Sequence, residues 1–424
     1  MMNRINRLEI RLISVAVASL FGVSLGAIAQ DDSGAPAGIP WGPVKVYPEV
    51  DLTFKSNDNV YSQSGTAGRP TNTSNITVLA PKVKLEAKTG PHTFDATYKV
   101  EHGRHSFAST DNYTDHTLGA SATWKFTGRS GLRLSAEYLK GHEDRGSVPA
   151  VGHPLPDEFH QSSFNALAGY GAEGAQGRVE FEAGLINKRY DNFQSDSFGN
   201  PDNTKRDRDD TKLGGTFYWR VMPKTQILFQ VTQTEYDYNQ GSFIGVGGAG
   251  NWTTLDSTDR KYLIGVTWEA AAKTTGIFKV GTIKKDFADS SLTDFSKAGW
   301  EGQVKWSPLT YSNFDFFTGK LPSESTIGNA SVDTRYGATW NHLWSSRLSS
   351  VVSYSNTKTE YQYNAGTIGT PQKDTTDALG LKLNYQWTRN VKVGAGYDRT
   401  DKTSNNATSE YKRNIYSIFL NAAI

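Results

Sequence analysis

The sequence contains no cysteine, and its charges nearly cancel. The lack of cysteine excludes disulfide frameworks, thiolate zinc sites and thiol catalysis, and it suits export to an oxidising compartment. The 45 basic and 43 acidic residues leave a formal net charge of only +2. We expect no nucleic-acid partner, because neutralising a phosphate backbone requires a clear excess of basic residues.

Long apolar runs are also missing, with one exception at the N-terminus. An uncharged segment at residues 12–29 follows three arginines and ends in Ala-Ile-Ala, the small-x-small pattern of a cleavage site. This pattern predicts a secretory signal peptide at residues 1–29, removed before Gln30. The alternative is a retained transmembrane helix, because a run of about 18 residues can just span a bilayer. The polar residues 31–38 favour the signal peptide, since they do not resemble a stop-transfer flank.

The rest of the chain combines low hydropathy with many aromatic residues. Hydrophobic residues make up 37% of the chain and the mean hydropathy is −0.54, but 12% of the residues are aromatic. A disordered chain would be poor in aromatic residues, and a helical membrane protein would need further apolar runs. An outer-membrane β-barrel accounts for both values, because only every second residue of its strands faces lipid.

Apolar and polar residues alternate along most of the chain after residue 44, the period of a strand with two different faces. Between residues 375 and 388, one face would carry Leu379, Leu381 and Leu383, with Lys382 and Asn384 on the other. We predict an all-β domain at residues 44–424, a transmembrane antiparallel β-barrel of about 18 strands, after a short periplasmic segment at residues 30–43. The predicted strands are 44–56, 75–88, 91–105, 112–127, 131–142, 159–171, 176–191, 206–221, 224–238, 257–270, 275–287, 296–307, 311–322, 332–343, 347–361, 375–388, 391–402 and 410–424.

The connections between these segments alternate between short and long. Outer-membrane barrels have tight periplasmic turns and longer extracellular loops, so the alternation predicts that both termini lie in the periplasm. A barrel of this size leaves an aqueous lumen unless a loop or plug fills it. The long loop at 239–256, which is rich in glycine, is the candidate to fold inward as a constriction. The clearest short turns are at 89–90, 128–130, 222–223, 344–346 and 389–390.

Tryptophan recurs where strands run down into the short turns. Indole rings prefer the headgroup level of a membrane, so these residues predict a periplasmic aromatic girdle. A general preference of aromatic residues for strands is the alternative, but it would not favour one end. The girdle residues are Trp124, Trp219, Trp268, Trp306, Trp340 and Trp387.

The polar faces of the strands supply candidate lumen-lining residues of both charge signs. A dense ring of one sign would indicate ion selectivity, whereas this mixture suits a neutral or modestly charged polar solute. The alternative is that these side chains only neutralise one another inside a wide barrel. The acidic candidates are Asp95, Glu101, Glu137, Glu180, Glu182, Glu301, Asp315 and Asp333, and the basic ones are Lys99, Lys125, Arg133, Arg220, Lys279, Lys305, Arg335 and Lys382.

A dense charge cluster begins the predicted strand at 206–221 on its outer side. Parity with Trp219 predicts that Arg206, Arg208 and Asp210 point inward, while Asp207 and Asp209 point outward. We expect a salt-bridge ladder at the rim. The alternative is that the two outward carboxylates contact calcium or lipopolysaccharide.

Histidines gather in the first half of the chain, and the topology brings them to the outer ends of neighbouring strands. A transition-metal site is conceivable there, but the spacing matches no standard ligand pattern, so we expect solvated rim histidines and no metal. The sequence also lacks the common motifs for a nucleophile with its base or a phosphate loop. We therefore expect neither an enzyme nor a cofactor. The rim histidines are His102, His105, His116, His142, His153 and His160.

Several segments resemble the β-barrel porin type 2 family, outer-membrane barrels often associated with exopolysaccharide loci. The segments are Tyr47 to Phe54 with the following Ser-Asn-Asp-Asn-Val, the Arg-Asp-Arg-Asp-Asp run at 206–210, Tyr218 to Thr225, Leu263 to Trp268, Trp306-Ser307-Pro308, and Tyr411 to Asn414. One departure is the C-terminal Ile424, where many barrels end in an aromatic residue that serves in assembly.

The resemblance implies export of a secreted polysaccharide across the outer membrane, together with periplasmic polysaccharide-export proteins. The expected surroundings are outer-membrane lipid and lipopolysaccharide. Two alternatives stay open at this point. One is a general or substrate-selective diffusion porin, and the other is a non-conducting scaffold for a surface assembly.

Overall fold

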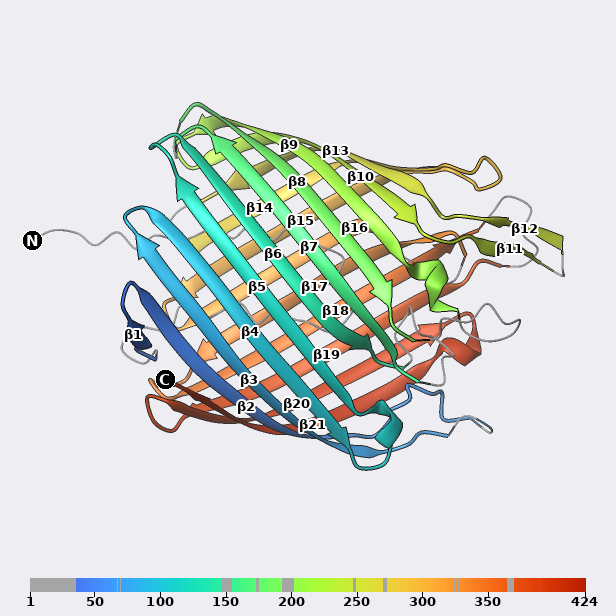
Figure 1. Cartoon of the computed structure of the whole chain (residues 1–424), viewed down its shortest axis with the longest axis horizontal. Helices are drawn as coiled ribbons and strands as arrows, with labels where there is room; N and C mark the ends of the chain where they lie inside the picture. The colour runs from blue at the N-terminus through green and yellow to red at the C-terminus, as the bar shows by residue number, and fades with distance from the viewer. Residues whose placement is uncertain are drawn as a thin grey trace, which may run out of the picture.

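A computed structural model describes residues 36–66, 68, 70–145, 155–172, 175–192, 202–246, 249–269, 273–323, 325, 328–363 and 370–424. The predicted signal peptide lies outside these residues. The chain forms a closed antiparallel barrel of 18 long strands, with a short additional strand at its start (Figure 1). The strands of the first half are β2 (Val44–Asn57), β3 (Ser74–Thr89), β4 (His92–His105), β5 (Tyr113–Lys125), β6 (Ser130–Glu143), β7 (Asp157–Tyr170), β8 (Gly177–Tyr190), β9 (Arg208–Met222) and β10 (Thr225–Tyr238).

The second half of the chain repeats this up-and-down order. The complete barrel confirms the predicted fold class. Each strand matches one predicted segment, with ends that differ by up to two residues, as at β9, which begins at 208 instead of 206. The remaining strands are β13 (Ser257–Trp268), β14 (Thr274–Phe287), β15 (Phe295–Leu309), β16 (Ser312–Ser323), β17 (Ala330–Leu343), β18 (Leu348–Gln362), β19 (Lys373–Gln386), β20 (Val391–Ser404) and β21 (Tyr411–Ala423).

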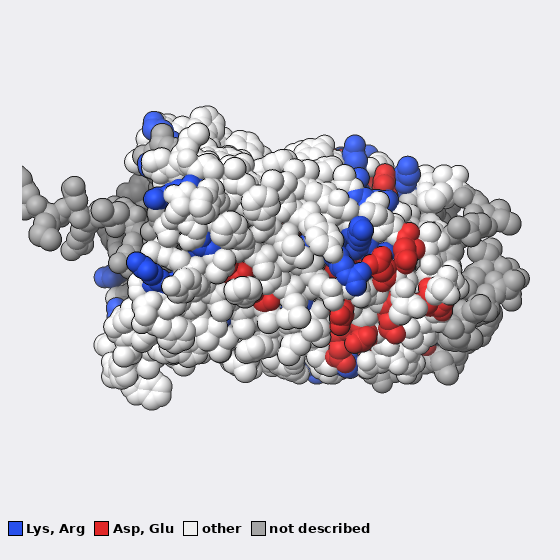
Figure 2. Space-filling model, turned by 90° about the horizontal axis from the view of Figure 1, so that it is seen from above, with Lys and Arg blue, Asp and Glu red and all other residues white. Residues whose placement is uncertain are grey.

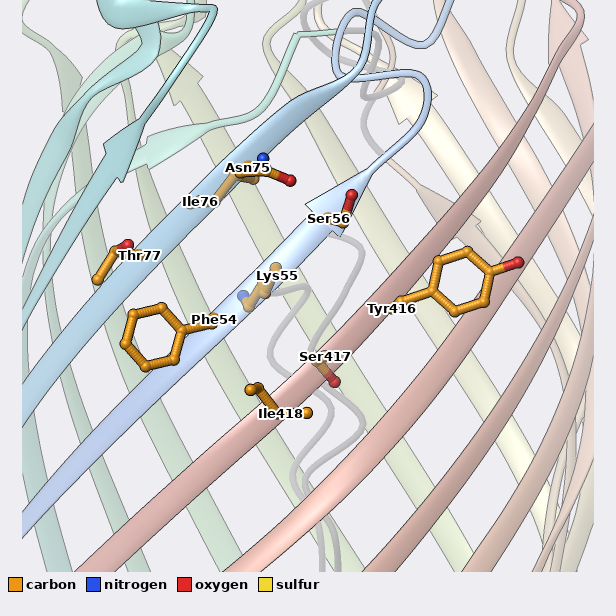
Figure 3. Close-up of a pocket in the computed structure, with 9 residues that line it drawn as sticks. All are labelled: Phe54, Lys55, Ser56, Asn75, Ile76, Thr77, Tyr416, Ser417 and Ile418. Carbon is orange, nitrogen blue, oxygen red and sulfur yellow. The ribbon is translucent and has the colours of Figure 1, made fainter.

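The barrel closes where the last strand pairs with the first long one. β21 lies antiparallel to β2, with Phe54 opposite Ile418, and these two side chains lie near each other on the wall at the seam (Figure 3). A shallow hollow here has walls from β2, β3 and β21 and includes the outward Phe54, Tyr416 and Ile418. Closure leaves no unpaired edge among the long strands, which a barrel in lipid requires.

The two ends of the barrel differ as predicted. Short turns lie at the end that also holds β1 (Ile39–Trp41) and the C-terminus, and the longer loops lie at the opposite end (Figure 1). β1 pairs with the start of β2, with Trp41 opposite Val44, an element that the sequence did not predict. By the usual arrangement of outer-membrane barrels, the end with the short turns is the periplasmic one.

One structural expectation is wrong. The loop at 239–256 does not fold inward as a constriction, because it forms a hairpin of β11 (Ser242–Val246) and β12 (Ala249–Thr253). The hairpin extends beyond the end of the barrel, away from the lumen (Figure 1). Two short strands can pair fully with each other, so this segment needs no partner inside the barrel.

The outer surface of the barrel carries large apolar side chains between two charged ends. Leu118, Phe229 and Ile264 are 52%, 50% and 48% exposed, values that a water-soluble protein would rarely combine over one continuous surface. In Figure 2, lysine and arginine side chains gather toward both ends of the molecule, and carboxylates gather mainly toward the end opposite the short turns. In the part of the chain that the structure describes, no helix is long and apolar enough to cross a membrane.

Candidate translocation channel

Side-chain alternation divides the barrel wall into an outward apolar face and an inward polar face. On β19, Leu381 and Leu383 are 41% and 48% exposed on the outside, and Lys382 between them points inward because successive strand residues face opposite sides. Residues that are paired across neighbouring strands face the same side, so the register assigns inward and outward residues on every strand. It places on the inward face Asp95, Lys99, Glu101, Lys125, Arg133, Glu137, Glu180, Glu182, Arg220, Lys279, Glu301, Lys305, Asp315, Asp333, Arg335 and Lys382.

At mid-height, the inward charges form pairs within or between neighbouring strands. Lys99 Nζ lies 2.6 Å from Glu101, and Lys212 Nζ lies 2.5 Å from Glu182. Glu301 receives two lysines, Lys261 at 3.5 Å and Lys279 in closer contact. Because these positive charges are compensated locally, this part of the wall is polar and hydrated without a strong field of one sign.

Other predicted lumen residues face an aromatic ring, pair along their own strand or stand apart from carboxylates. The ammonium group of Lys382 lies 4.2 Å from the centre of the Phe419 ring. Arg335 contacts its neighbour Asp333 along the same strand. Within the described residues, Lys125, Arg133 and Arg220 make no ion pair.

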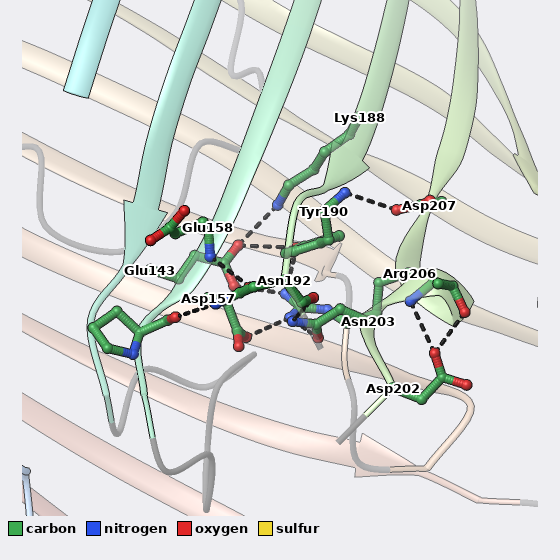
Figure 4. A network of polar contacts seen from close by, with 12 residues as sticks. Glu143, Asp157, Glu158, Lys188, Tyr190, Asn192, Asp202, Asn203, Arg206 and Asp207 are labelled. Atoms are coloured by element: carbon green, nitrogen blue, oxygen red, sulfur yellow. Dashed lines mark hydrogen bonds and ion pairs between the residues drawn. The ribbon is translucent and has the colours of Figure 1, made fainter. Parts of the chain in front are cut away.

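The outer mouth contains a buried charged network that the sequence did not predict (Figure 4). Glu143 at the end of β6 accepts hydrogen bonds from Lys188 at 2.8 Å, Arg206 at 2.6 Å and the Tyr190 hydroxyl at 3.0 Å. Arg206 also donates to Asp157 at 2.7 Å. Asp157 and Tyr190 are fully buried, with 0% exposure. Buried charges are stable only when they are paired, so the network fixes β6, β7 and β8 at this end.

The charge cluster at 206–210 takes part in this network with one correction. Arg206 is not a strand residue, because it ends a short 3₁₀ helix, η3 (Asn203–Arg206), whose first turn is capped by the Asp202 carboxylate. Arg206 still points into the barrel. Arg208 and Asp210 follow on the inward face of β9 and are joined by a 2.8 Å hydrogen bond.

The two other acidic residues of the cluster lie on the opposite side. Asp209 pairs with Arg189 at 2.9 Å, and Asp207 accepts a hydrogen bond from the Tyr190 backbone amide at 2.8 Å. Burial raises the pKa of the Asp207 carboxyl. The cluster is therefore a set of ion pairs across the wall at the rim. Contact of Asp207 or Asp209 with calcium or lipopolysaccharide stays a prediction.

Two further inward networks lie at the same end of the barrel. On β14, Lys285 donates to Asp259 of β13 at 2.9 Å. On β19, Asp374 accepts hydrogen bonds from the Tyr361 hydroxyl at 3.0 Å and from Lys402, whose Nζ lies 2.9 Å away. Together with the Glu143 network, these pairs surround the outer mouth with neutralised charge. A motif search could not find them, because each pair joins residues from different strands.

The rim histidines do not converge on one point. His102 and His116 point outward and bond to Thr114 and Tyr98. His142 is bonded to Asp115 and Asp144, and His160 to Asp191. His153 lies outside the described residues. Among the described residues, no group of three or more potential ligands is placed to hold a metal ion.

The predicted girdle tryptophans all lie on outward-facing positions toward the short turns. Trp306 stacks on Phe314, with ring centroids 5.1 Å apart, and Phe314 in turn stacks on Trp340 at 6.1 Å. His342 and Trp344 continue this row, with centroids 4.3 Å apart, although the sequence prediction left them out. Trp124, Trp219, Trp268 and Trp387 occupy equivalent positions on β5 and β9 and at the ends of β13 and β19.

The closed barrel with a polar interior agrees with the comparison of the sequence with known families. Residues 32–423 match the family described as Putative beta-barrel porin 2. The chain belongs to this family. It is an outer-membrane, porin-like β-barrel channel, and the resemblance found in the sequence is confirmed. No match is found among curated proteins.

Solved outer-membrane barrels with similar folds share little sequence with this porin 2 member. OpdL of Pseudomonas aeruginosa is 9% identical over 90% of this chain and 98% of its own, with a TM-score of 0.46. OccAB4 of Acinetobacter baumannii is 11% identical over 90% and 98%, also with a TM-score of 0.46. The copper transporter OprC is 10% identical over 91% and 82%, with a TM-score of 0.46.

Proposed function

We propose that this porin 2 member exports an extracellular polysaccharide through its lumen. The observation that supports the proposal is the inner wall, where paired charges alternate with inward-facing aromatic rings. Sugar chains bind through many weak hydrogen bonds and through packing of their rings on aromatic side chains. A wall of this kind offers weak contacts at many heights, so a polymer can slide without falling into a deep trap, as conduction requires.

Two aromatic residues supply this second kind of contact. Phe317 faces inward on β16 and is 42% exposed. Phe419 on β21 is half-buried and faces Lys382, whose ammonium group lies 4.2 Å from the ring centre. Tyr218 on β9 does not offer such a contact, because it is only 4% exposed beneath the Arg178 guanidinium and donates a hydrogen bond to Glu180 at 3.0 Å. A periplasmic export protein would deliver the polymer to the short-turn end.

Deletion of the gene tests the proposal. The mutant should lose surface and secreted polysaccharide, while uptake of small solutes stays unchanged. Complementation with the wild-type chain should restore secretion. Normal secretion by the deletion strain would contradict export.

A diffusion porin is the second candidate, and the outward direction of the β11–β12 hairpin favours it, because this hairpin does not narrow the lumen. Purified protein in a planar bilayer separates the two functions. A steady, large conductance together with normal secretion in the deletion strain would support the diffusion porin.

A further inference from the structure

The periplasmic mouth differs in charge from the rest of the lumen. Within two positions of the short-turn ends of the strands, the charged residues on the inward face are all basic. They are Lys45, Lys88, Lys125, Arg178, Arg220 and Lys392. The connecting turns add five basic residues against two acidic ones in the sequence, namely Arg129, Lys224, Lys273, Arg347 and Arg389 against Glu173 and Glu269.

Part of this basic charge has no carboxylate beside it. Lys88 and Arg178 pair with Glu86 at 2.7 Å and Glu180 at 3.2 Å. In contrast, Lys125 and Arg220 form no ion pair within the described residues, and neither does Arg133 one position deeper. At the depth of Arg133 the inward face also carries the carboxylates of Glu86, Asp95, Glu180 and Asp315. In the view of Figure 2, the short-turn end shows lysine and arginine side chains without neighbouring carboxylates, while the opposite end shows both.

At the outer mouth, basic side chains are instead locked to carboxylates. Lys188 contacts Glu143 at 2.8 Å and Lys402 contacts Asp374 at 2.9 Å, and all four groups are nearly inaccessible to solvent. The net field in the lumen is therefore positive at the periplasmic mouth and compensated farther along. A cleft lined by one sign of charge, with walls of low dielectric constant, concentrates ligands of the opposite sign.

The inward direction of these side chains indicates which ligand they meet. On the outside of the same strands, at the same height, stand the girdle residues Trp124 and Trp219, so lipid headgroups face rings and not these cations. An acidic partner protein would contact the turns, whereas Arg133 and Arg220 lie in the wall itself. The remaining candidate is an anionic molecule that enters the pore.

We propose that the periplasmic mouth recruits a polysaccharide that carries negative charge, such as carboxylates on its sugar rings. This inference rests on the proposed export function and specifies its substrate class. The pair of Lys382 and Phe419 fits such a sugar, because the ammonium group can contact a carboxylate and the half-buried ring can pack on the sugar ring. Beyond the mouth the paired wall no longer attracts the polymer, so it is not retained.

Polygalacturonate and neutral dextran of similar length are suitable probes in planar bilayers. Polygalacturonate added at the periplasmic side should block the current at low salt, and dextran should block it far less. The block should weaken steeply as ionic strength rises, because salt screens exposed charges. Equal block by both polymers, or a block independent of salt, would overturn the inference. This test needs only the wild-type protein.

A triple variant, Lys125→Gln with Arg133→Gln and Arg220→Gln, tests the residues. We expect the concentration of polygalacturonate that blocks half the current to rise about tenfold or more. The matched control changes three exposed lysines on the outside of the other end, Lys140, Lys284 and Lys358, to glutamine, and should leave the block unchanged. An unchanged block in the lumen variant would overturn the assignment.

The outcomes separate this inference from the export function. If the deletion strain lacks polysaccharide but the missing polymer is uncharged, export stands and the anionic substrate is wrong. If polygalacturonate blocks the channel in the predicted manner while the deletion strain secretes normally, the anion-binding mouth stands and export is wrong.

Discussion

Single residues on β19 show how strictly the two faces of the wall are separated. Leu381 is outward and 41% exposed, and Asn384 is inward, where it contacts the Ser349 hydroxyl at 3.5 Å. Leu381→Arg should lower the free energy of unfolding by about 2 to 4 kcal/mol, because arginine on the lipid face is costly near the bilayer midplane. Asn384→Arg should have little effect. Denaturant titration in lipid vesicles measures both, and equal losses would contradict the assignment of faces.

Arg206 illustrates the cost of removing one member of a buried charged network. Arg206→Gln removes the guanidinium that donates to both Glu143 and Asp157, while Lys188 still contacts Glu143, and we expect a loss of about 3 to 5 kcal/mol. Arg189→Gln is the control, since its partner Asp209 is half exposed and such pairs contribute about 1 kcal/mol or less. Thermal unfolding in detergent compares them. Similar losses for both variants would show that the network contributes little.

Asp207 provides a test of pH dependence. Burial raises the pKa of its carboxyl, so ionisation at neutral pH disfavours the folded state relative to the unfolded one. Asp207→Asn should therefore raise the unfolding temperature at pH 7, since the amide oxygen can still accept from Tyr190. The gain should shrink as pH falls and vanish below the unfolded pKa of about 3.9. A gain that grows toward low pH would have the wrong sign.

At the scale of elements, the alternation of short turns and long loops determines the orientation in the membrane. Single cysteines at Lys224, in a short turn, and at Ser109, in η1 (Ser109–Asp111) at the other end, can be labelled on whole cells because the native chain has no cysteine. An impermeant thiol reagent should label only Ser109→Cys. After outer-membrane permeabilisation, Lys224→Cys should also react, which controls for reactivity. Labelling of Lys224→Cys alone in intact cells would reverse the topology.

The β11–β12 hairpin is an element whose removal should not change conduction. It extends beyond the barrel and pairs with itself, so replacing residues 242–253 by a short Gly-Ser linker should leave the single-channel conductance unchanged. The unfolding temperature should change little as well. A clear rise in conductance would mean that this segment narrows the pore in the membrane.

At the scale of the whole molecule, the barrel combines a neutralised outer mouth with a basic periplasmic one. The outer networks bury their charges and hold strand ends together, whereas Lys125, Arg133 and Arg220 stay open to the lumen. With the proposed polyanionic substrate, this asymmetry would attract the polymer at the periplasmic end only.

The sequence by itself determined the number of long strands, their limits to within two residues and the face of their side chains. These properties follow from alternation with a period of two, which is local and repeats in every strand. The same local rule placed the girdle tryptophans and the inward charges. Counted from the outward Trp219, the same alternation correctly predicted that Arg208 and Asp210 face inward on β9 and that Asp209 faces outward.

Only the tertiary structure decided which charged residues contact one another and in which direction the loops between the strands extend. Glu143 and Arg206 are 63 positions apart, and they meet because the register of three strand pairs brings the ends of β6 and β8 level with η3. The relative height of two distant residues depends on the register of every strand pair between them. No single segment of the sequence encodes it. The hairpin at 242–253 is similar, because its direction depends on the strand ends that carry it and not on its own glycine-rich sequence.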